Sequence, residues 1–327
     1  MAGLEDWLAR GDLDELLREC DRLCERRDWD RLVRLRDGAR AAFDRGHQLW
    51  PAAAHAEYRL ALEAPAEWAV PAVESASGQF TLGPLTEVVA STHRWAELRP
   101  HVTDGRVGAL IAHERVIRGD EVDPADGIDP TVLDLPMEVG GWEPTYATAT
   151  YHAHRVETPR PALPPPGRLV PLPDPGLRVD DPDTISALHD LAATWADDSN
   201  GRVEVAAVEG DAASAVASLG PGQAALTRLP AATAVALMGW TAASGGGHGR
   251  RRGAAAGRFG AWWAAAALTD LLDDWPVPGP ELGEAVAELV WYGWSAGEPD
   301  TGWACRLAIE DPAHGLAWAI GAVDAAD

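Results

Sequence analysis

The sequence predicts a mainly helical α+β fold in three segments. Apolar residues recur at helical spacing through the first part of the chain, which predicts an irregular array of packed helices over residues 1–118. Acidic residues and prolines become dense over residues 119–182, as is typical of an extended connector. Over residues 183–327 β-prone runs alternate with helical patterns, so we expect an α+β domain with a small sheet of about four strands.

The helices of the N-terminal array have recognisable start signals. Asp12 with Glu15 resembles a capping box, and Asp28 precedes a second apolar stripe. Pro51 lies in the first turn of a third helix, where its missing N–H is not needed. About one tryptophan falls in each predicted helix, at positions 7, 29, 50, 68 and 95. The spacing of these tryptophans is uneven, so a strict helical repeat is not predicted.

The connector contains nine prolines between residues 159 and 182, a density that excludes helix and central strand. The preceding run TYATATYHAHRVE alternates and indicates a strand, on which His152 and His154 would point to one face, as in some metal sites. The chain lacks the many regularly spaced strands of a metal-binding barrel, so we interpret the run as a half-exposed strand. His55 and His113 lie on helices without a second ligand pair at metal spacing. We therefore predict no metal ligands and no cofactor.

The C-terminal domain is predicted from alternating elements. Strands are expected at RVEVAAVEG, at QAALTRL and in a hairpin around residues 311–315. Helices are expected at ISALHDLAATWADD, from Ala212, and before a glycine-rich loop. A further helix carries Trp262 and Trp263, and another begins near Pro280 with Glu281 in its first turn.

The composition excludes several classes of function. All 27 basic residues are arginines, so reactions that need a lysine, such as Schiff-base or Walker-type chemistry, are excluded. The formal net charge of −24 argues against binding to nucleic acid or to an anionic membrane. No apolar run is long enough to span a bilayer and no secretory signal is visible, so a cytoplasmic location is expected. The three cysteines are expected to be reduced, with Cys20 and Cys24 buried.

The run SGGGHGRRRG is the strongest candidate binding site. Arginines gather at the start of the following helix and aspartates at its end, which is the reverse of what the helix dipole favours. Glycines allow close backbone approach, and guanidinium groups beside a helix N-terminus suit a phosphate or carboxylate. The predicted ligand-binding residues are Gly246, Gly247, His248, Arg250, Arg251, Arg252 and Arg258.

A structural interpretation of the same loop stays open. Acidic residues of the connector can neutralise the arginines as internal salt bridges, because structural ion pairs explain charge clusters as readily as ligands do. The loop is not a known phosphate-binding motif. It lacks the Walker lysine and follows a helix rather than a strand.

Three functional hypotheses follow. The first is a cytoplasmic binding or regulatory protein whose loop holds an anionic small molecule or an acidic segment of a partner protein. The second is an enzyme that acts on a phosphorylated or carboxylated metabolite, with His248 as general acid or base. The third is a structural protein whose arginines clasp its own connector.

Four stretches resemble an uncharacterised protein family of unknown function from high-GC bacteria. They are HQLWPAAAHAEYRLALEAP, AHERVIRGD, SGGGHGRRRGAAAGRFGAWW and GLAWAIGAVD. The resemblance extends over most of the chain and implies one evolved unit. It implies no activity, cofactor or catalytic residue.

Overall fold

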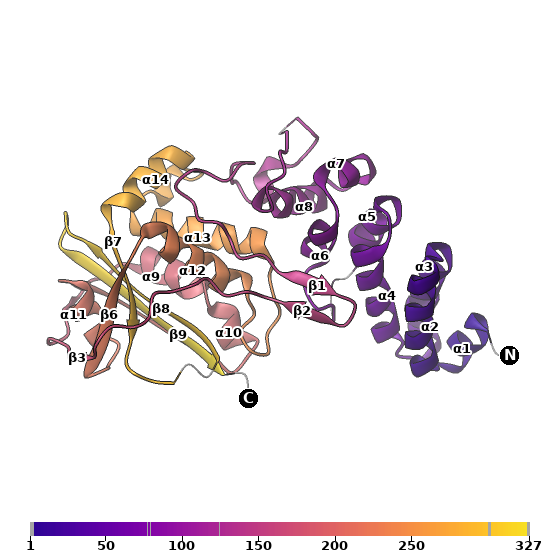
Figure 1. Ribbon diagram of the computed structural model, residues 1–327, viewed down its shortest axis with the longest axis horizontal. Coiled ribbons are helices and arrows are strands. Elements are labelled where there is room, and N and C mark those ends of the chain that lie inside the picture. Colours follow the sequence, from indigo (N-terminus) through magenta and orange to yellow (C-terminus); the bar gives the residue numbers. More distant parts are fainter. Residues whose placement is uncertain (1–2, 77, 79, 124, 300–301, 326–327) are drawn as a thin grey trace. The chain divides into compact units, whose positions relative to one another are not determined.

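The computed structural model describes residues 3–76, 78, 80–123, 125–299 and 302–325. The chain forms two compact units (Figure 1). The first contains Met1–Val132 and Ala149–Thr158, and the second contains Leu133–Thr148 and Pro159–Asp327. Each unit therefore takes up part of the predicted connector, residues 119–182. Among the described helices, none combines the length and apolar character needed to cross a membrane.

The first unit is built from helices around a core of leucine and alanine. Leu16, Leu32 and Leu60 are completely buried in it. The predicted helix starts are confirmed at Asp12 and Asp28, whose carboxylates accept backbone N–H groups in the first turn. The helices are α1 (Leu4–Arg10), α2 (Leu13–Arg26), α3 (Trp29–Ala41), α4 (Trp50–Glu63), α5 (Ala66–Ser75), α6 (Leu85–Thr92), α7 (Trp95–Leu98) and α8 (Gly105–Ile117). Short 3-10 turns lie at Phe43–Arg45, Arg99–His101 and Pro130–Val132.

A small hairpin completes the first unit. Strands β1 (Thr150–His152) and β2 (Arg155–Glu157) pair antiparallel, with His152 opposite Arg155. The sequence indicated one strand with both histidines on the same face, and the structure corrects this. Because the chain turns at Ala153 and His154, His152 lies at the end of a strand and His154 lies in the turn.

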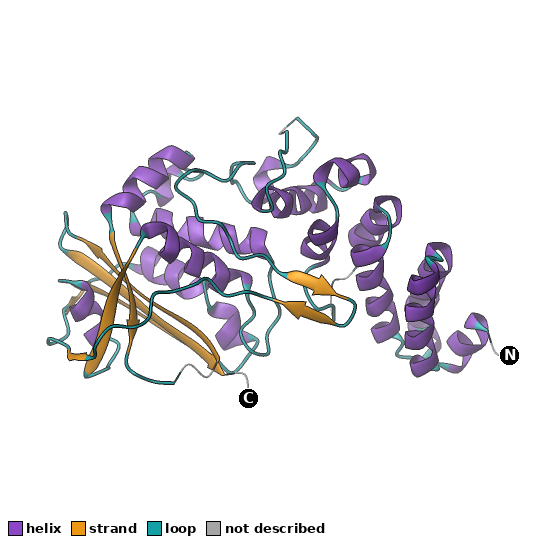
Figure 2. Ribbon diagram, in the orientation of Figure 1, coloured by secondary structure: helices purple, strands orange, loops and turns teal. Residues whose placement is uncertain are grey.

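The second unit contains a seven-stranded antiparallel sheet, where about four strands were predicted (Figure 2). The four predicted strands are present as β5, β6, β8 and β9. The sequence missed β7, and it missed two-residue strands at the two edges, β3 and β4, which the proline-rich segment supplies. Proline is tolerated at such edges because no ladder N–H is required there. The spatial order is β3 (Val170–Pro171), β6 (Gln223–Leu229), β7 (Val290–Ser295), β8 (Gly302–Asp311), β9 (Leu316–Ala325), β5 (Arg202–Glu209) and β4 (Leu177–Arg178).

Helices cover both faces of this sheet unequally. Alternate residues of β9 divide between two cores, with Trp318 and Ile320 in the larger one and Ala317 and Ala319 in the smaller one. The short helix α11 covers the smaller core, and most other helices of the unit pack in the larger one. The helices are α9 (Pro182–Asp190), α10 (Ala193–Asp197), α11 (Ala212–Ala217), α12 (Ala231–Ala243), α13 (Ala254–Leu268) and α14 (Gly279–Glu288), with a 3-10 turn at Leu272–Asp274.

Candidate functional site

The Gly–Arg loop, residues 244–253, connects α12 to α13 in the second unit. The two helices pack so closely that a Cβ atom on Gly257 would lie 2.3 Å from the carbonyl oxygen of Gly239. At the far end of the loop the backbone N–H of Arg252 donates to the carbonyl of Ala243, at 2.8 Å. The start and end of the loop are therefore fixed to one another.

Internal close approach explains the glycines of this loop. Gly246 has a φ of +73°, and a Cβ atom there would lie 2.3 Å from an Asp324 oxygen. Gly245 and Gly249 cross so closely that a Cβ on either would meet the backbone of the other at less than 2.5 Å. Only glycine fits a positive φ or a backbone crossing without strain. The sequence could not assign Gly246 to packing, because its partner Asp324 lies on another segment of the chain.

Two backbone N–H groups of the loop, those of Gly247 and His248, already donate to side chains of the chain itself. The N–H of Gly247 donates to Oδ2 of Asp324 at 2.5 Å, and the Ser199 hydroxyl donates to the same oxygen at 2.7 Å. The N–H of His248 donates in turn to Ser199 Oγ at 3.1 Å. Asp324 is buried near the end of β9. Ser199 and Asp324 carry no local motif, so neither was predicted from the sequence.

The start of the loop is held by a second group of hydrogen bonds. The indole N–H of Trp195 donates to Ser244 Oγ at 2.9 Å, and the hydroxyl of Thr194 donates to the Ser244 carbonyl at 3.2 Å. The Ser244 hydroxyl donates to the carbonyl of Thr241. Since both Trp195 and Ser244 are buried, the bond between them is shielded from competing water.

Arg258 has an environment different from the loop arginines. It is completely buried, and its guanidinium donates to both carboxylate oxygens of Glu143 at 2.8 Å. It also donates to the carbonyls of Pro136 and Glu138. Four donor contacts leave this side chain little capacity for a ligand. The connector therefore neutralises Arg258 internally, as the third hypothesis expected for the arginines in general.

The carboxylate of Glu143 is held in its ionised form. Burial alone opposes ionisation, but the hydrogen bonds and positive charge of Arg258 outweigh it, and the pKa of Glu143 lies below its ordinary value. The Tyr146 hydroxyl and the Trp262 indole N–H also donate to this carboxylate, at 2.7 and 2.8 Å. The group is a structural element of the second unit.

The side chains of the loop itself are differently placed. Those of His248, Arg250 and Arg252 are exposed, while that of Arg251 is half-buried. The structure thus separates the predicted residues into glycines that shape the loop, a buried Arg258, and cationic side chains that solvent can reach.

The aspartates at the other end of α13 line a separate depression of about 580 Å³. Asp270 and Asp273 lie there with Asp181 and Asp311. Two of these carboxylates have internal roles, since Asp181 accepts the Trp318 indole N–H and Asp311 pairs with His314. The arginines at the start of α13 and the aspartates at its end therefore lie in two different environments.

A second cluster of functional groups lies in the first unit. Asp21 of α2, His55 of α4 and His154 of the β1–β2 turn each offer a ligand atom, and these atoms lie within 4.8 Å of one another. His55 Nε2 is 3.2 Å from Asp21 Oδ1, and His154 Nε2 is 3.9 Å from the same oxygen. Burial lowers the pKa of His55. It outweighs the hydrogen bond and charge of Asp21, which raise this pKa, so the neutral imidazole is favoured. The sequence did not predict this cluster, because its members are remote along the chain.

Arg59 connects this cluster to its surroundings. Its Nη1 donates to Asp21 Oδ1, and its Nε donates to Glu63 Oε1 at 2.7 Å. His152 takes no part, because its Nε2 lies near Glu157, at 3.4 Å. The hairpin thus directs its two histidines to different carboxylates.

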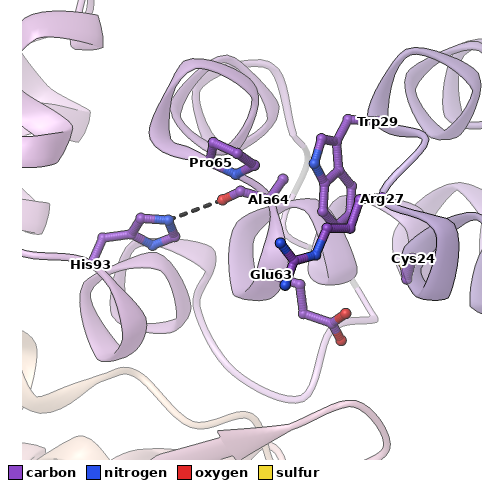
Figure 3. Close-up of a pocket in the computed structure, with 7 residues that line it drawn as sticks. All are labelled: Cys24, Arg27, Trp29, Glu63, Ala64, Pro65 and His93. Carbon is purple, nitrogen blue, oxygen red and sulfur yellow. Dashed lines mark hydrogen bonds between the residues drawn. The ribbon is translucent and has the colours of Figure 1, made fainter.

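Glu63 also lines a depression of about 440 Å³, where Arg27 extends into the same opening (Figure 3). His93 Nε2 lies 2.9 Å from the Ala64 carbonyl there. Burial raises the pKa of the Cys24 thiol to about 12, so the thiol is protonated at neutral pH. The protonated Cys24 thiol is therefore a poor nucleophile in this depression.

The fold and the loop define a two-unit α+β protein with an arginine-bearing loop held by internal hydrogen bonds. The chain belongs to a family of unknown function, DUF6183, whose model matches residues 14–313. Searches among curated proteins and among solved structures found no match.

Proposed function

We propose that the protein is a binding protein whose Gly–Arg loop holds an anionic group, a phosphate or a carboxylate, of a small molecule or of an acidic protein segment. The observation that carries the proposal is the contrast between a fixed loop backbone and exposed cationic side chains. Asp324, Ser199 and the Ala243 carbonyl hold the backbone, while Arg250 and Arg252 are exposed. A loop ordered before binding loses less conformational entropy when it binds.

We propose that the guanidinium groups, and not the loop backbone, contact the anion. The N–H groups of Gly247 and His248 are already bonded within the chain, so an incoming anion would have to displace Asp324 or Ser199 to reach them. A guanidinium presents a planar fork of donors that fits a carboxylate or phosphate. Arg250 and Arg252 are therefore the proposed contacts, with His248 as a neighbouring donor.

Thermal-shift measurements and calorimetry with a panel of phosphates, nucleotides and acidic peptides test this proposal. A matched control is available in Arg168→Ala/Arg178→Ala, which removes two exposed arginines of the same unit and changes the net charge equally. Arg250→Ala/Arg252→Ala should weaken binding about tenfold or more, since hydrogen bonds to charged groups contribute about 1.5–3 kcal/mol each. Equal weakening in the two double variants, or no binding by the wild type, would refute the proposal.

A further inference from the structure

We infer that Asp21, His55 and His154 form a binding site for a divalent transition-metal ion of the Zn²⁺ class. Three side chains from separate parts of the chain meet at one point. Helix α2, helix α4 and the turn between β1 and β2 each contribute one of the three ligand atoms, all within 4.8 Å of one another. The sequence predicted no metal ligands because residues 21, 55 and 154 show no metal spacing along the chain.

The donor set selects the class of ion. Two imidazole nitrogens and one carboxylate oxygen suit Zn²⁺ and its neighbours, whereas Ca²⁺ and Mg²⁺ favour oxygen donors throughout. Three protein ligands leave at least one coordination position for water or for a bound molecule. That is the arrangement of a metal site able to bind or activate a further ligand, unlike a closed structural site with four protein ligands.

Closing the site requires His154 to turn and approach, because its imidazole ring stacks on that of His55 with the ring centroids 5.6 Å apart. Metal–ligand bonds of about 2.0–2.1 Å place tetrahedral ligand atoms roughly 3.3 Å apart. His55 Nε2 and Asp21 Oδ1 already lie 3.2 Å apart, while His154 Nε2 is 3.9 Å from the same oxygen. The His154 side chain is 67% exposed and sits in a hairpin turn, so it has room to approach. His55 and Asp21 provide the fixed part of the site.

Arg59 fits the site as an outer partner of the carboxylate. Its Nη1 bonds Asp21 while its Nε bonds Glu63. A metal-binding carboxylate is commonly hydrogen-bonded by such a neighbour, which orients it. The Glu63 carboxylate also balances the positive charge of Arg59. Asp21, Arg59 and Glu63 together therefore keep one net negative charge, which favours a cation.

Zn²⁺ and Co²⁺ titration of the full chain, purified without a histidine tag and treated with a chelator, tests the inference. We expect one ion per chain in competition with a chromophoric chelator. Bound Co²⁺ should give visible ligand-field absorption without a thiolate charge-transfer band, because Cys20 and Cys24 are not in the predicted ligand set. No binding, or a thiolate band, would overturn the assignment.

Variants locate the ion. His154→Ala and Asp21→Asn should each lower Zn²⁺ affinity by more than the roughly 10–100-fold that follows loss of an outer-shell partner. His152→Ala is the matched control, because it lies on the same hairpin but faces Glu157, and its affinity should equal that of the wild type. Circular dichroism checks that each variant folds, and His154→Gln replaces His154→Ala if the latter does not. Unchanged affinity in the folded His154 variant, or an equal loss in His152→Ala, would place the ion elsewhere.

Discussion

Arg258 and Glu143 form an ion pair in which both side chains are completely buried, with Nε 2.8 Å from Oε2. The pair joins α13 to a segment 115 residues earlier in the chain. The Tyr146 hydroxyl and the Trp262 indole N–H occupy further acceptor sites of the carboxylate. Removal of either charged partner would leave the other charge buried without compensation, which is much more costly than removal of both.

Arg258→Met should therefore lower the free energy of unfolding by about 3–5 kcal/mol, measured by urea denaturation. The double variant Arg258→Met/Glu143→Leu should lose less than the sum of the two single changes, because no charge is left unpaired. Arg168→Ala serves as an exposed control and should stay within about 0.5 kcal/mol of the wild type. A loss below about 1 kcal/mol for Arg258→Met would show that the pair is not structural.

The same pair predicts a pH dependence of stability. The pKa of Glu143 in the folded protein is lowered, so its ionised form contributes stability above the unfolded value of 4.5, and this contribution is lost as the pH falls through the folded pKa. Glu143→Gln should be less stable than the wild type at neutral pH, and the difference should shrink in acid. Urea denaturation of both proteins, from neutral pH to below the folded pKa of Glu143, measures this difference in unfolding free energy. A constant difference would contradict the assigned ionisation.

Gly246→Ala should destabilise the protein more than Gly315→Ala does. Both glycines have positive φ, +73° and +67°, so both alanines carry similar backbone strain, of the order of 1–2 kcal/mol. The added Cβ meets Asp324 Oδ2 at 2.3 Å in the first case and open space in the second. The difference in unfolding free energy should be about 1–3 kcal/mol, from the disturbed buried hydrogen bonds. Equal effects would mean that Asp324 does not hold the loop.

The three thiols should be unreactive in the folded protein at neutral pH. Burial raises the pKa of Cys24 to about 12 and that of Cys305 to about 11, and it raises the pKa of Cys20 further. Because the thiolate is the nucleophile, a disulfide reagent should label these cysteines only after denaturant is added. Rapid labelling of any thiol in the native state would contradict the structure at that position.

The sequence predicted the parts of the fold that local patterns control. The carboxylates of Asp12 and Asp28 mark helix starts, and β-prone runs beside turn residues mark the strands β5, β6, β8 and β9. Strand β7 was missed because Val290–Ser295 lacks a regular alternation, and β3 and β4 because prolines conceal two-residue edge strands. Strands β3, β4 and β7 are recognised only from their hydrogen bonds to neighbouring strands of the sheet.

The sites were less accessible to sequence analysis for the same reason. The unusual charge pattern pointed to the Gly–Arg loop, but not to Asp324, which lies far from Gly247 in the chain and has no motif. Arg258 could not be separated from Arg252 by spacing, although one is buried and the other exposed. The Asp21, His55 and His154 cluster is entirely a product of tertiary packing.

An NMR titration with pyrophosphate tests whether the guanidinium groups of the loop hold the anion, because arginine Nε–H and backbone N–H signals can be followed together. If the loop holds an anion through its guanidinium groups, the Nε–H signals of Arg250 and Arg252 should shift, while the backbone signals of Gly247 and His248 stay nearly unchanged. Those two N–H groups remain bonded to Asp324 and Ser199. Large shifts of Gly247 and His248 with unmoved arginine signals, or no shifts at all, would contradict anion binding by the guanidinium groups.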